Sequence, residues 1–378
     1  MCTIAENPAD EESRPRAKIV RMTEDTPDDN ALREAGQILR EGGLVAFPTE
    51  TVYGLGGNAL DPDAARRIYA AKGRPSDNPL IVHIADIDAL ETIASSVPDA
   101  ARRLAEACWP GPLTMIFEKT DAVPEATTGG LDSVAVRFPS SRIANRLIRY
   151  AGGYVAAPSA NTSGRPSPTL ASHVIEDLGD RIDYIIDGGQ VDIGLESTIV
   201  DFTVSPPVIL RPGYISRKML QELIGEVEVD PGLQSDSESV RPKAPGMKYR
   251  HYAPRAELTI VEGAAAAAAI RKLARQKTEE GLRVGIICTD ETAGTYQDGI
   301  VWSLGTRSDE AGIAHHLYEI LRESDAEAVD VIYSESFRTP VMGQAIMNRL
   351  LKAAGHRVLL ADEILAQCGS DVDKGIEL

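Results

Sequence analysis

Residues Leu44–Ile84, LVAFPTETVYGLGGNALDPDAARRIYAAKGRPSDNPLIVHI, form the stretch around which the rest of the chain is organised. The apolar run Leu44–Phe47 predicts a buried strand, and Pro48 ends it because proline cannot donate a hydrogen bond to a sheet. We then expect the chain to leave the sheet between Thr49 and Asn58. Hydroxyls and glycines dominate that segment, so it can donate hydrogen bonds and bring backbone close to a ligand.

The second half of this stretch predicts a helix and a basic loop. Asp61 and Pro62 are typical of a helix start, and the basic segment KGRP at 72–75 follows the helix. A second apolar strand, 80–84, carries His83. Hydroxyls, glycine amides and two cations thus come from strand and helix ends, which suits an anionic ligand. Each feature alone is more often a plain turn or a solvated pair, and a lone histidine on an apolar strand is more often structural.

Composition bounds the class of protein. The chain has 378 residues, of which 43% are hydrophobic and 25% charged, so we expect about two globular domains. No apolar run approaches the roughly 20 residues of a membrane span, and the first residues lack the apolar core of a signal peptide, so we expect a cytoplasmic protein. Four widely spaced cysteines predict neither disulfides nor a zinc knuckle.

The net charge is −18, which argues against tight binding to nucleic acid through a broad basic surface. Any anion site must therefore be local. Two explanations of the acidity remain open: charge that keeps the protein soluble, and adaptation to a salty cytoplasm in which screening makes an acidic surface tolerable.

Three further predicted strands either carry an arginine or are followed by a polar loop or an arginine. The strand at 154–157 ends in PSANTSGRPS at 158–167, which repeats the order strand, proline, hydroxyls, glycine and cation. Surface turns have the same composition, and only the repetition favours a site. Arg137 lies on the apolar strand 133–139, which favours a carboxylate partner over an exposed edge position. Arg211 follows the strand 208–210 directly.

Composition also divides the chain into parts. We expect a disordered tail over 1–15, a first α/β domain over 16–225, a linker over 226–256, a second domain over 257–366 and a tail over 367–378. The linker begins acidic and then turns basic and aromatic over 243–254, which predicts that it docks on the protein. Alternating strands and helices beyond residue 257 predict a small parallel α/β fold. No Walker loop, dinucleotide fingerprint or metal-ligand cluster occurs, so we expect no protein-bound metal.

The motifs together resemble the two-domain form of the L-threonylcarbamoyl-AMP synthase family. They are PTETVYGLG from Pro48, KGRPSDNPLIVHI from Lys72, AVRFP from Ala135, APSANTSG from Ala157, GLESTIV from Gly194, LRPG from Leu210, APGMKYRHYAP from Ala244 and MGQAIMNRLLKAA from Met342. The resemblance covers nearly the whole chain past the first residues. It implies a YrdC-like twisted open α/β sheet with a concave groove, followed by a smaller Rossmann-like parallel α/β domain.

The resemblance also implies an activity and a set of residues. Such enzymes combine L-threonine, bicarbonate and ATP, with Mg²⁺, into threonylcarbamoyl-AMP and pyrophosphate, and a tRNA threonylcarbamoyl transferase uses the product to modify the adenosine next to the anticodon. The implied threonine contacts are Thr51, His83, Arg137, the backbone of Ala157, and Ser197, which lies near both ligands. The implied nucleotide contacts are Arg74, Asn78, the backbone of Ser133, Ser159, Ser167, Arg211 and Tyr252. We add Lys72 and Asn161 as phosphate-side or magnesium-side groups.

The chemistry explains why such residues would be needed. The reaction requires no enzymic nucleophile, so the protein supplies positioning and charge neutralisation. Lys72, Arg74 and Arg211 suit a triphosphate that loses pyrophosphate, with Lys72 and Arg74 in the catalytic role, and Arg137 suits the threonine carboxylate. Because carbamate and mixed anhydride decompose in water, we expect the linker, with Tyr249, His251 and Tyr252, to cover the groove.

Two other classes of function are open at this point. An RNA-binding or ribosome-assembly module is conceivable because single-domain relatives have a basic groove, although the acidity and the lack of aromatic basic strips weigh against it, and we expect direct tRNA binding to be weak. A carbamoyl transferase of the hydrogenase-maturation kind uses a similar domain, but those relatives carry cysteine-pair zinc motifs that this sequence lacks.

Overall fold

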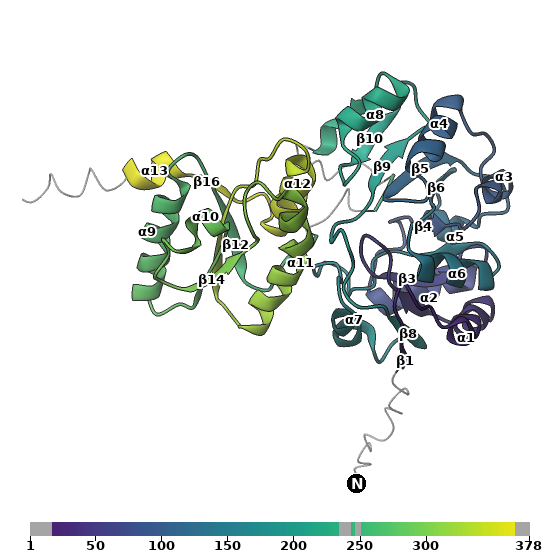
Figure 1. Cartoon of the computed structure of the whole chain (residues 1–378), viewed down its shortest axis with the longest axis horizontal. Helices are drawn as coiled ribbons and strands as arrows, with labels where there is room; N and C mark the ends of the chain where they lie inside the picture. The colour runs from purple at the N-terminus through teal and green to yellow at the C-terminus, as the bar shows by residue number, and fades with distance from the viewer. Residues whose placement is uncertain (1–16, 234–242, 246–250, 367–378) are drawn as a thin grey trace, which may run out of the picture.

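The computed structural model describes residues 17–233, 243–245 and 251–366, and it has two α/β parts, each built on its own sheet (Figure 1). The expected tails at 1–15 and 367–378 lie outside the described residues. The same holds for much of the expected linker, including Tyr249.

The first part contains a mixed sheet of eleven strands in the order β1-β8-β2-β3-β7-β4-β6-β5-β9-β10-β11. The strands are β1 Lys18–Arg21, β2 Val45–Phe47, β3 Gly54–Asn58, β4 Ile81–His83, β5 Leu113–Glu118, β6 Ser133–Arg137, β7 Val155–Ala156, β8 Tyr184–Asp187, β9 Thr198–Asp201, β10 Val208–Arg211 and β11 Glu228–Val229. The order jumps repeatedly along the chain, so residues distant in sequence meet across neighbouring strands.

Helices pack on both faces of this sheet. They are α1 Asp29–Arg40, α2 Pro62–Lys72, α3 Leu90–Ile93, α4 Asp99–Cys108, α5 Glu125–Thr128, α6 Arg142–Tyr150, α7 Ala171–Leu178 and α8 Arg217–Ile224. Helices α1 and α6 share one core with β2 and β8, and α2, α4, α7 and α8 contribute to the larger core. Helix α2 begins as expected, with the Asp61 side chain accepting a hydrogen bond from Asp63 N at 2.9 Å and Pro62 in the first turn.

Several elements differ from the sequence expectations, and three of them bear on the first part of the chain. Residues Gly54–Asn58 were expected in a loop but form β3, antiparallel to β2. The strand needs glycine because its neighbours leave no room for a side chain. A Cβ on Gly56, for example, would lie 2.9 Å from the Phe47 ring. Helix α7 was not expected. Strand β11 occupies the start of the acidic segment that was interpreted as linker, and it pairs in parallel with β10.

The second part is a parallel sheet in the order β14-β13-β15-β12-β16, as the alternating pattern predicted. Its elements are β12 Glu257–Glu262, α9 Ala266–Glu279, β13 Val284–Cys288, α10 Asp290–Ala293, β14 Ile300–Ser303, α11 Glu310–Ala326, β15 Val331–Glu335, α12 Gly343–Ala353, β16 Val358–Leu360 and α13 Ala361–Ala366. Helices α11 and α12 face the first part (Figure 1). The core under them also takes in Val52, Leu195 and Tyr252.

Within the described ranges, none of the helices has the length and apolar character needed to cross a membrane.

Candidate active site

A pocket that is partly open to solvent lies between the first part and the end of the interdomain segment. Its walls come from β4, β6 and β10 and from the segments beside β2, β7 and β9. The lining residues are Thr49, Thr51, Val52, Gly54, Arg74, Ile81, His83, Arg137, Ala157, Pro158, Ser159, Glu196, Ser197, Arg211, Pro245, His251 and Tyr252. Arg74, Arg137, Ser159 and Arg211, from four separate segments, therefore share one hollow.

The structure brings nine of the fourteen expected site residues to the pocket wall. They are Thr51, Arg74, His83, Arg137, Ala157, Ser159, Ser197, Arg211 and Tyr252. The other five, which are Lys72, Asn78, Ser133, Asn161 and Ser167, do not line it. Of these, Ser133 begins β6, at the opposite end of that strand from Arg137. The Asn78 backbone oxygen accepts a hydrogen bond from Arg74 Nε at 3.2 Å, so Asn78 supports a pocket residue.

The expected threonine side of the pocket is built on the parallel pair β4 and β6, which places His83 opposite Arg137. Arg137 is buried, and its Nη2 lies 2.8 Å from Glu50 Oε1, so the carboxylate partner expected for it is present. Burial, and next the neighbouring Arg137 charge, lower the pKa of the His83 imidazole to about 3. The His83 ring is therefore neutral at neutral pH and available for hydrogen bonding.

The expected nucleotide side has two buried guanidinium groups. Arg74 donates to the backbone oxygens of Asn78 and Pro79, and Arg211 donates to Ser197 O at 3.0 Å and Ser197 Oγ at 3.1 Å. Within the described part of the chain, neither arginine forms an ion pair with a carboxylate. Burial lowers the pKa of Arg74 to about 10, which still leaves it cationic at neutral pH. The negative charge of Glu196 acts on Arg211 without an ion pair at close range. Two buried guanidinium groups that form no ion pair favour binding of an anion.

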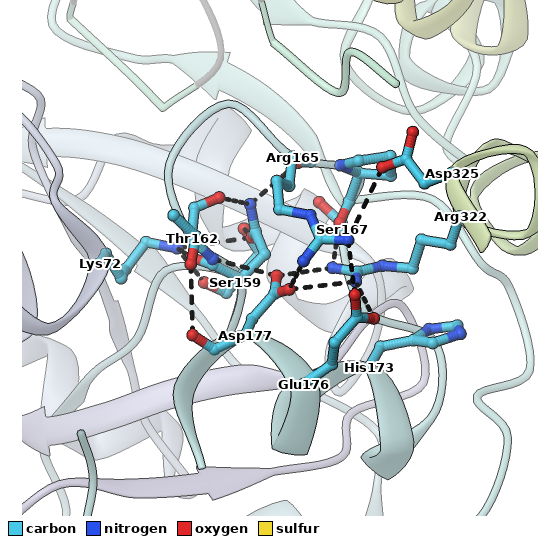
Figure 2. Close-up of polar contacts among 12 residues, drawn as sticks. Lys72, Ser159, Thr162, Arg165, Ser167, His173, Glu176, Asp177, Arg322 and Asp325 are labelled. Carbon is cyan, nitrogen blue, oxygen red and sulfur yellow. Dashed lines mark hydrogen bonds and ion pairs between the residues drawn. The ribbon is translucent and has the colours of Figure 1, made fainter. Parts of the chain in front are cut away.

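The loop 158–167 is held on one side by Lys72 of α2 (Figure 2). Lys72 at the end of that helix is buried and donates to the backbone oxygens of Ser159 and Asn161, each at 2.5 Å. Within the loop, Ser159 Oγ lies 2.5 Å from Asn161 Oδ1. Burial, and next the charge of Arg74, lower the pKa of the Lys72 amine well below its usual range. In this arrangement Lys72 shapes the loop instead of facing the pocket.

The same loop is held from the other side by α11 of the second part. Arg322 donates to Pro166 O at 2.6 Å and to Asp177 Oδ2 at 2.8 Å, and all three residues are buried. Arg165 pairs with the same Asp177 carboxylate, so two guanidinium groups converge on it (Figure 2). Asp177 lies on α7, the helix that the sequence did not predict.

Glu196 is a pocket residue that the sequence reasoning did not select. Its carboxylate accepts hydrogen bonds from Ser167 Oγ at 2.5 Å, Tyr318 OH at 2.9 Å and Arg349 Nε at 3.0 Å. Burial alone would raise the pKa of this carboxyl, but Arg349 and then Arg211 lower it to about 2. The only sequence signal was its place in GLEST, because its partners Tyr318 and Arg349 lie more than 120 residues away.

The end of the interdomain segment closes one wall of the pocket. Pro245, His251 and Tyr252 line it, and the Tyr252 ring lies 5.1 Å from the Tyr318 ring. Tyr252 has φ of 65°, a left-handed conformation that is uncommon outside glycine and requires support from its surroundings. Burial, and next the charge of Arg74, lower the pKa of His251 to about 3.

Comparison with known proteins agrees with this geometry. A family model described as "Telomere recombination" matches residues 37–213, and one described as "Threonylcarbamoyl-AMP synthase, C-terminal domain" matches 215–355. The threonylcarbamoyl-AMP synthase of Pyrococcus abyssi is 49% identical over 330 residues, which cover 87% of this chain and 95% of that protein. The chain belongs to the threonylcarbamoyl-AMP synthase family. Membership confirms the resemblance and makes the chain an enzyme whose activity is the synthesis of threonylcarbamoyl-AMP for tRNA modification.

Other relatives of the synthase family support the same conclusion. The threonylcarbamoyl-AMP synthase of Bacillus subtilis is 49% identical over 332 residues, 88% of this chain and 95% of that protein. The crystal structure of P. abyssi Sua5 complexed with L-threonine superposes with a TM-score of 0.86 at 47% identity, covering 91% of this chain and 99% of that chain. The expected two-domain fold is thereby confirmed.

Proposed function

We propose that the pocket binds L-threonine and ATP side by side and joins them through bicarbonate. The observation that carries this proposal is the pair of buried guanidinium groups of Arg74 and Arg211. Within the described residues neither forms an ion pair with a carboxylate, and both line the same hollow as Thr51, His83 and Arg137. In its support, a solved relative that superposes over nearly the whole chain was crystallised with L-threonine.

In this proposal the protein positions the reactants and neutralises charge. The ammonium group of threonine first gives up a proton, and the neutral amine then combines with bicarbonate to form a carbamate and water. A carbamate oxygen then attacks the α-phosphorus of ATP, and pyrophosphate leaves with the electron pair of the broken P–O bond. Arg137 holds the threonine carboxylate, while Arg74 and Arg211 face the phosphates. Ser197 places a hydroxyl near both ligands, and Ser159 places one on the nucleotide side.

Mg²⁺ enters this scheme as the counterion of ATP, where it bridges phosphate oxygens and reduces their charge. In the described ranges, no group of three or more histidine, cysteine or acidic side chains is arranged to hold a metal ion. Glu196 is already bonded by three side chains. The residues of the pocket therefore fit a Mg²⁺ ion that arrives bound to ATP. Asn161 is the residue proposed to lie on the magnesium side.

The interdomain segment is proposed to shield the reactants from water. Pro245, His251 and Tyr252 already form pocket wall, and both carbamate and product hydrolyse in open solvent. Release of the product to a tRNA threonylcarbamoyl transferase in the cytoplasm completes the proposal. Direct tRNA binding is expected to be weak because of the charge of −18.

The decisive experiment incubates the protein with Mg-ATP, L-threonine and labelled bicarbonate. We expect pyrophosphate that appears only when threonine and bicarbonate are both present, together with label in an adenylate product. An ATP analogue with a methylene bridge between the α- and β-phosphorus should bind and give no product. Pyrophosphate release independent of threonine, or an unlabelled adenylate, would refute the proposed reaction.

A further inference from the structure

Arg349, on α12 of the second part, reaches the pocket of the first. Its side chain is fully buried. Nε lies 3.0 Å from the Glu196 carboxylate, Nη2 donates to Glu196 O at 3.3 Å, and Nη1 donates to Pro212 O. One guanidinium thus fastens two segments of the first part, and the planar fork of arginine suits such a set of acceptors better than a single amine does.

The two segments that Arg349 fastens carry pocket residues at the adjacent positions. Ser197 follows Glu196, and Arg211 precedes Pro212. Arg211 in turn donates to both the backbone and the hydroxyl of Ser197. The segments also run so close that a Cβ on Gly213 would lie 2.4 Å from Thr198 N. Small displacements of either segment therefore move Ser197 and Arg211 together.

Tyr318 on α11 completes the connection. Its hydroxyl donates to the Glu196 carboxylate at 2.9 Å, and its ring packs against Tyr252, which lines the pocket. Glu196 also accepts a hydrogen bond from Ser167 at the end of the loop 158–167. The carboxylate of Glu196 is thus the point where two helices of the second part meet three segments of the pocket wall.

We propose that Arg349 is a positioning residue for the synthase reaction, which holds Ser197 and Arg211 at the place where the amino acid and the triphosphate meet. The second part of the chain therefore supports the pocket wall through Arg349, which does not itself contact substrate. The inference rests on the proposed function, because it takes from it the roles of Ser197 and Arg211.

The test must separate positioning from stability. Arg349→Met alone leaves the Glu196 charge buried without its main partner, which is strongly destabilising. Arg349→Met combined with Glu196→Gln removes both charges, keeps similar volumes and leaves an amide that can still accept from Ser167 and Tyr318. Gln190→Ala serves as the control because Gln190 bonds Glu319 across the two parts, at 3.1 Å, outside the pocket.

Steady-state kinetics of labelled product formation provide the readout, with folding checked by thermal unfolding. For the double variant we expect about a 10-fold rise in the KM for ATP and about a 10-fold fall in kcat, the scale on which small misplacements act. If Arg349 had only a structural role, the double variant would have a lower folded fraction and hence a lower apparent kcat. Its KM values for ATP and threonine would be unchanged. Gln190→Ala should match the wild type in kcat, in the KM for ATP and in the KM for threonine.

Arg349→Lys keeps a charge beside Glu196 and provides a second variant should the double variant fail to fold. A single amine cannot bond the Glu196 carboxylate and Pro212 O together as the fork does, so the KM for ATP should still rise several-fold. Wild-type constants in either folded variant would overturn the inference. A wild-type protein without threonine-dependent synthesis would instead overturn the proposed function, so the two failures are distinguishable.

Discussion

Arg137 Nη2 lies 2.8 Å from Glu50 Oε1, and both side chains are buried beside the pocket. Glu50 follows β2 and Arg137 ends β6, so the ion pair joins two strands that are not neighbours in the sheet. Because the carboxylate holds the guanidinium from one side, it determines where Arg137 can meet a substrate carboxylate.

Glu50→Gln should therefore weaken threonine binding. The amide keeps the shape but not the charge that fixes Arg137, so we expect the KM for threonine to rise roughly 10-fold, about 1.4 kcal/mol, with the KM for ATP unchanged. Glu34→Gln is a suitable control, because the Glu34 carboxylate pairs with Lys18 in solvent. An equal rise in the KM for threonine and the KM for ATP would show that Glu50 supports the fold in general.

Arg74→Met should reduce ATP affinity. A charge-assisted hydrogen bond contributes about 2 kcal/mol, so the dissociation constant for Mg-ATP should rise roughly 30-fold, as measured by calorimetry. Arg67→Met on the preceding helix α2 is the matched control, since Arg67 bonds only the Gly42 backbone oxygen among the described contacts. Unchanged ATP affinity in Arg74→Met would remove this guanidinium from the nucleotide site.

Lys72→Met should loosen the loop 158–167 even without nucleotide. The backbone oxygens of Ser159 and Asn161 would lose their buried donor, at a cost of about 1–3 kcal/mol. Hydrogen exchange of the loop amides should accelerate in the ligand-free variant. A lysine whose role was confined to the phosphates would leave this exchange unchanged and affect ATP binding alone.

Tyr252→Ala should lower product yield more than it lowers stability. The ring packs on Tyr318 and forms pocket wall, so its loss admits water to the carbamate and the adenylate. Labelled product per pyrophosphate released measures the leak, and Tyr252→Phe, which keeps the ring, should retain most of the yield. Deletion of residues 244–252 should act in the same direction as Tyr252→Ala. Unchanged synthesis in Tyr252→Ala would reject the shielding role.

Stability should fall as the pH is lowered from 6.5 towards 5. The pKa of His83 is about 3 in the folded protein and about 6.5 when unfolded, so the unfolded state binds more protons in this window. His83 therefore contributes up to about 1.4 kcal/mol per pH unit to the decline of the unfolding free energy. Denaturant unfolding of His83→Gln should show a shallower decline, whereas His316→Gln, on the exposed face of α11, should match the wild type.

Local sequence patterns predicted most elements because their signals are contained within a few residues. Asp61 and Pro62 mark the start of α2, and the apolar runs at β2, β4 and β6 appear where expected. Strand β3 was missed because its glycines are selected by the close approach of Phe47, a tertiary effect without a propensity signal. Helix α7 was missed although its Asp177 anchors two arginines.

The site residues that lie within short sequence motifs were predictable. The contacts between residues far apart in the sequence were not. Arg137 and Arg211 stand out as cations on or directly after apolar strands, Arg74 lies in the basic loop after a helix, and all three share the pocket. The bond between Glu196 and Arg349 spans 153 residues, and no spacing in the sequence connects them. Lys72 looked like a phosphate ligand for the same reason as Arg74, since the sequence does not specify whether a cation faces the pocket or a backbone oxygen.

The buried bond between Glu196 and Arg349 also bears on engineering by domain exchange. A chimera that joins the first half of this chain to the second half of a relative keeps Glu196 but takes the residue opposite it from the other protein. Where the foreign half lacks an arginine at the equivalent place, the graft leaves an uncompensated carboxylate at the seam. Compatibility of the two halves therefore depends on matched buried pairs such as Glu196 with Arg349 and Asp177 with Arg322, each of which should be transferred as a unit.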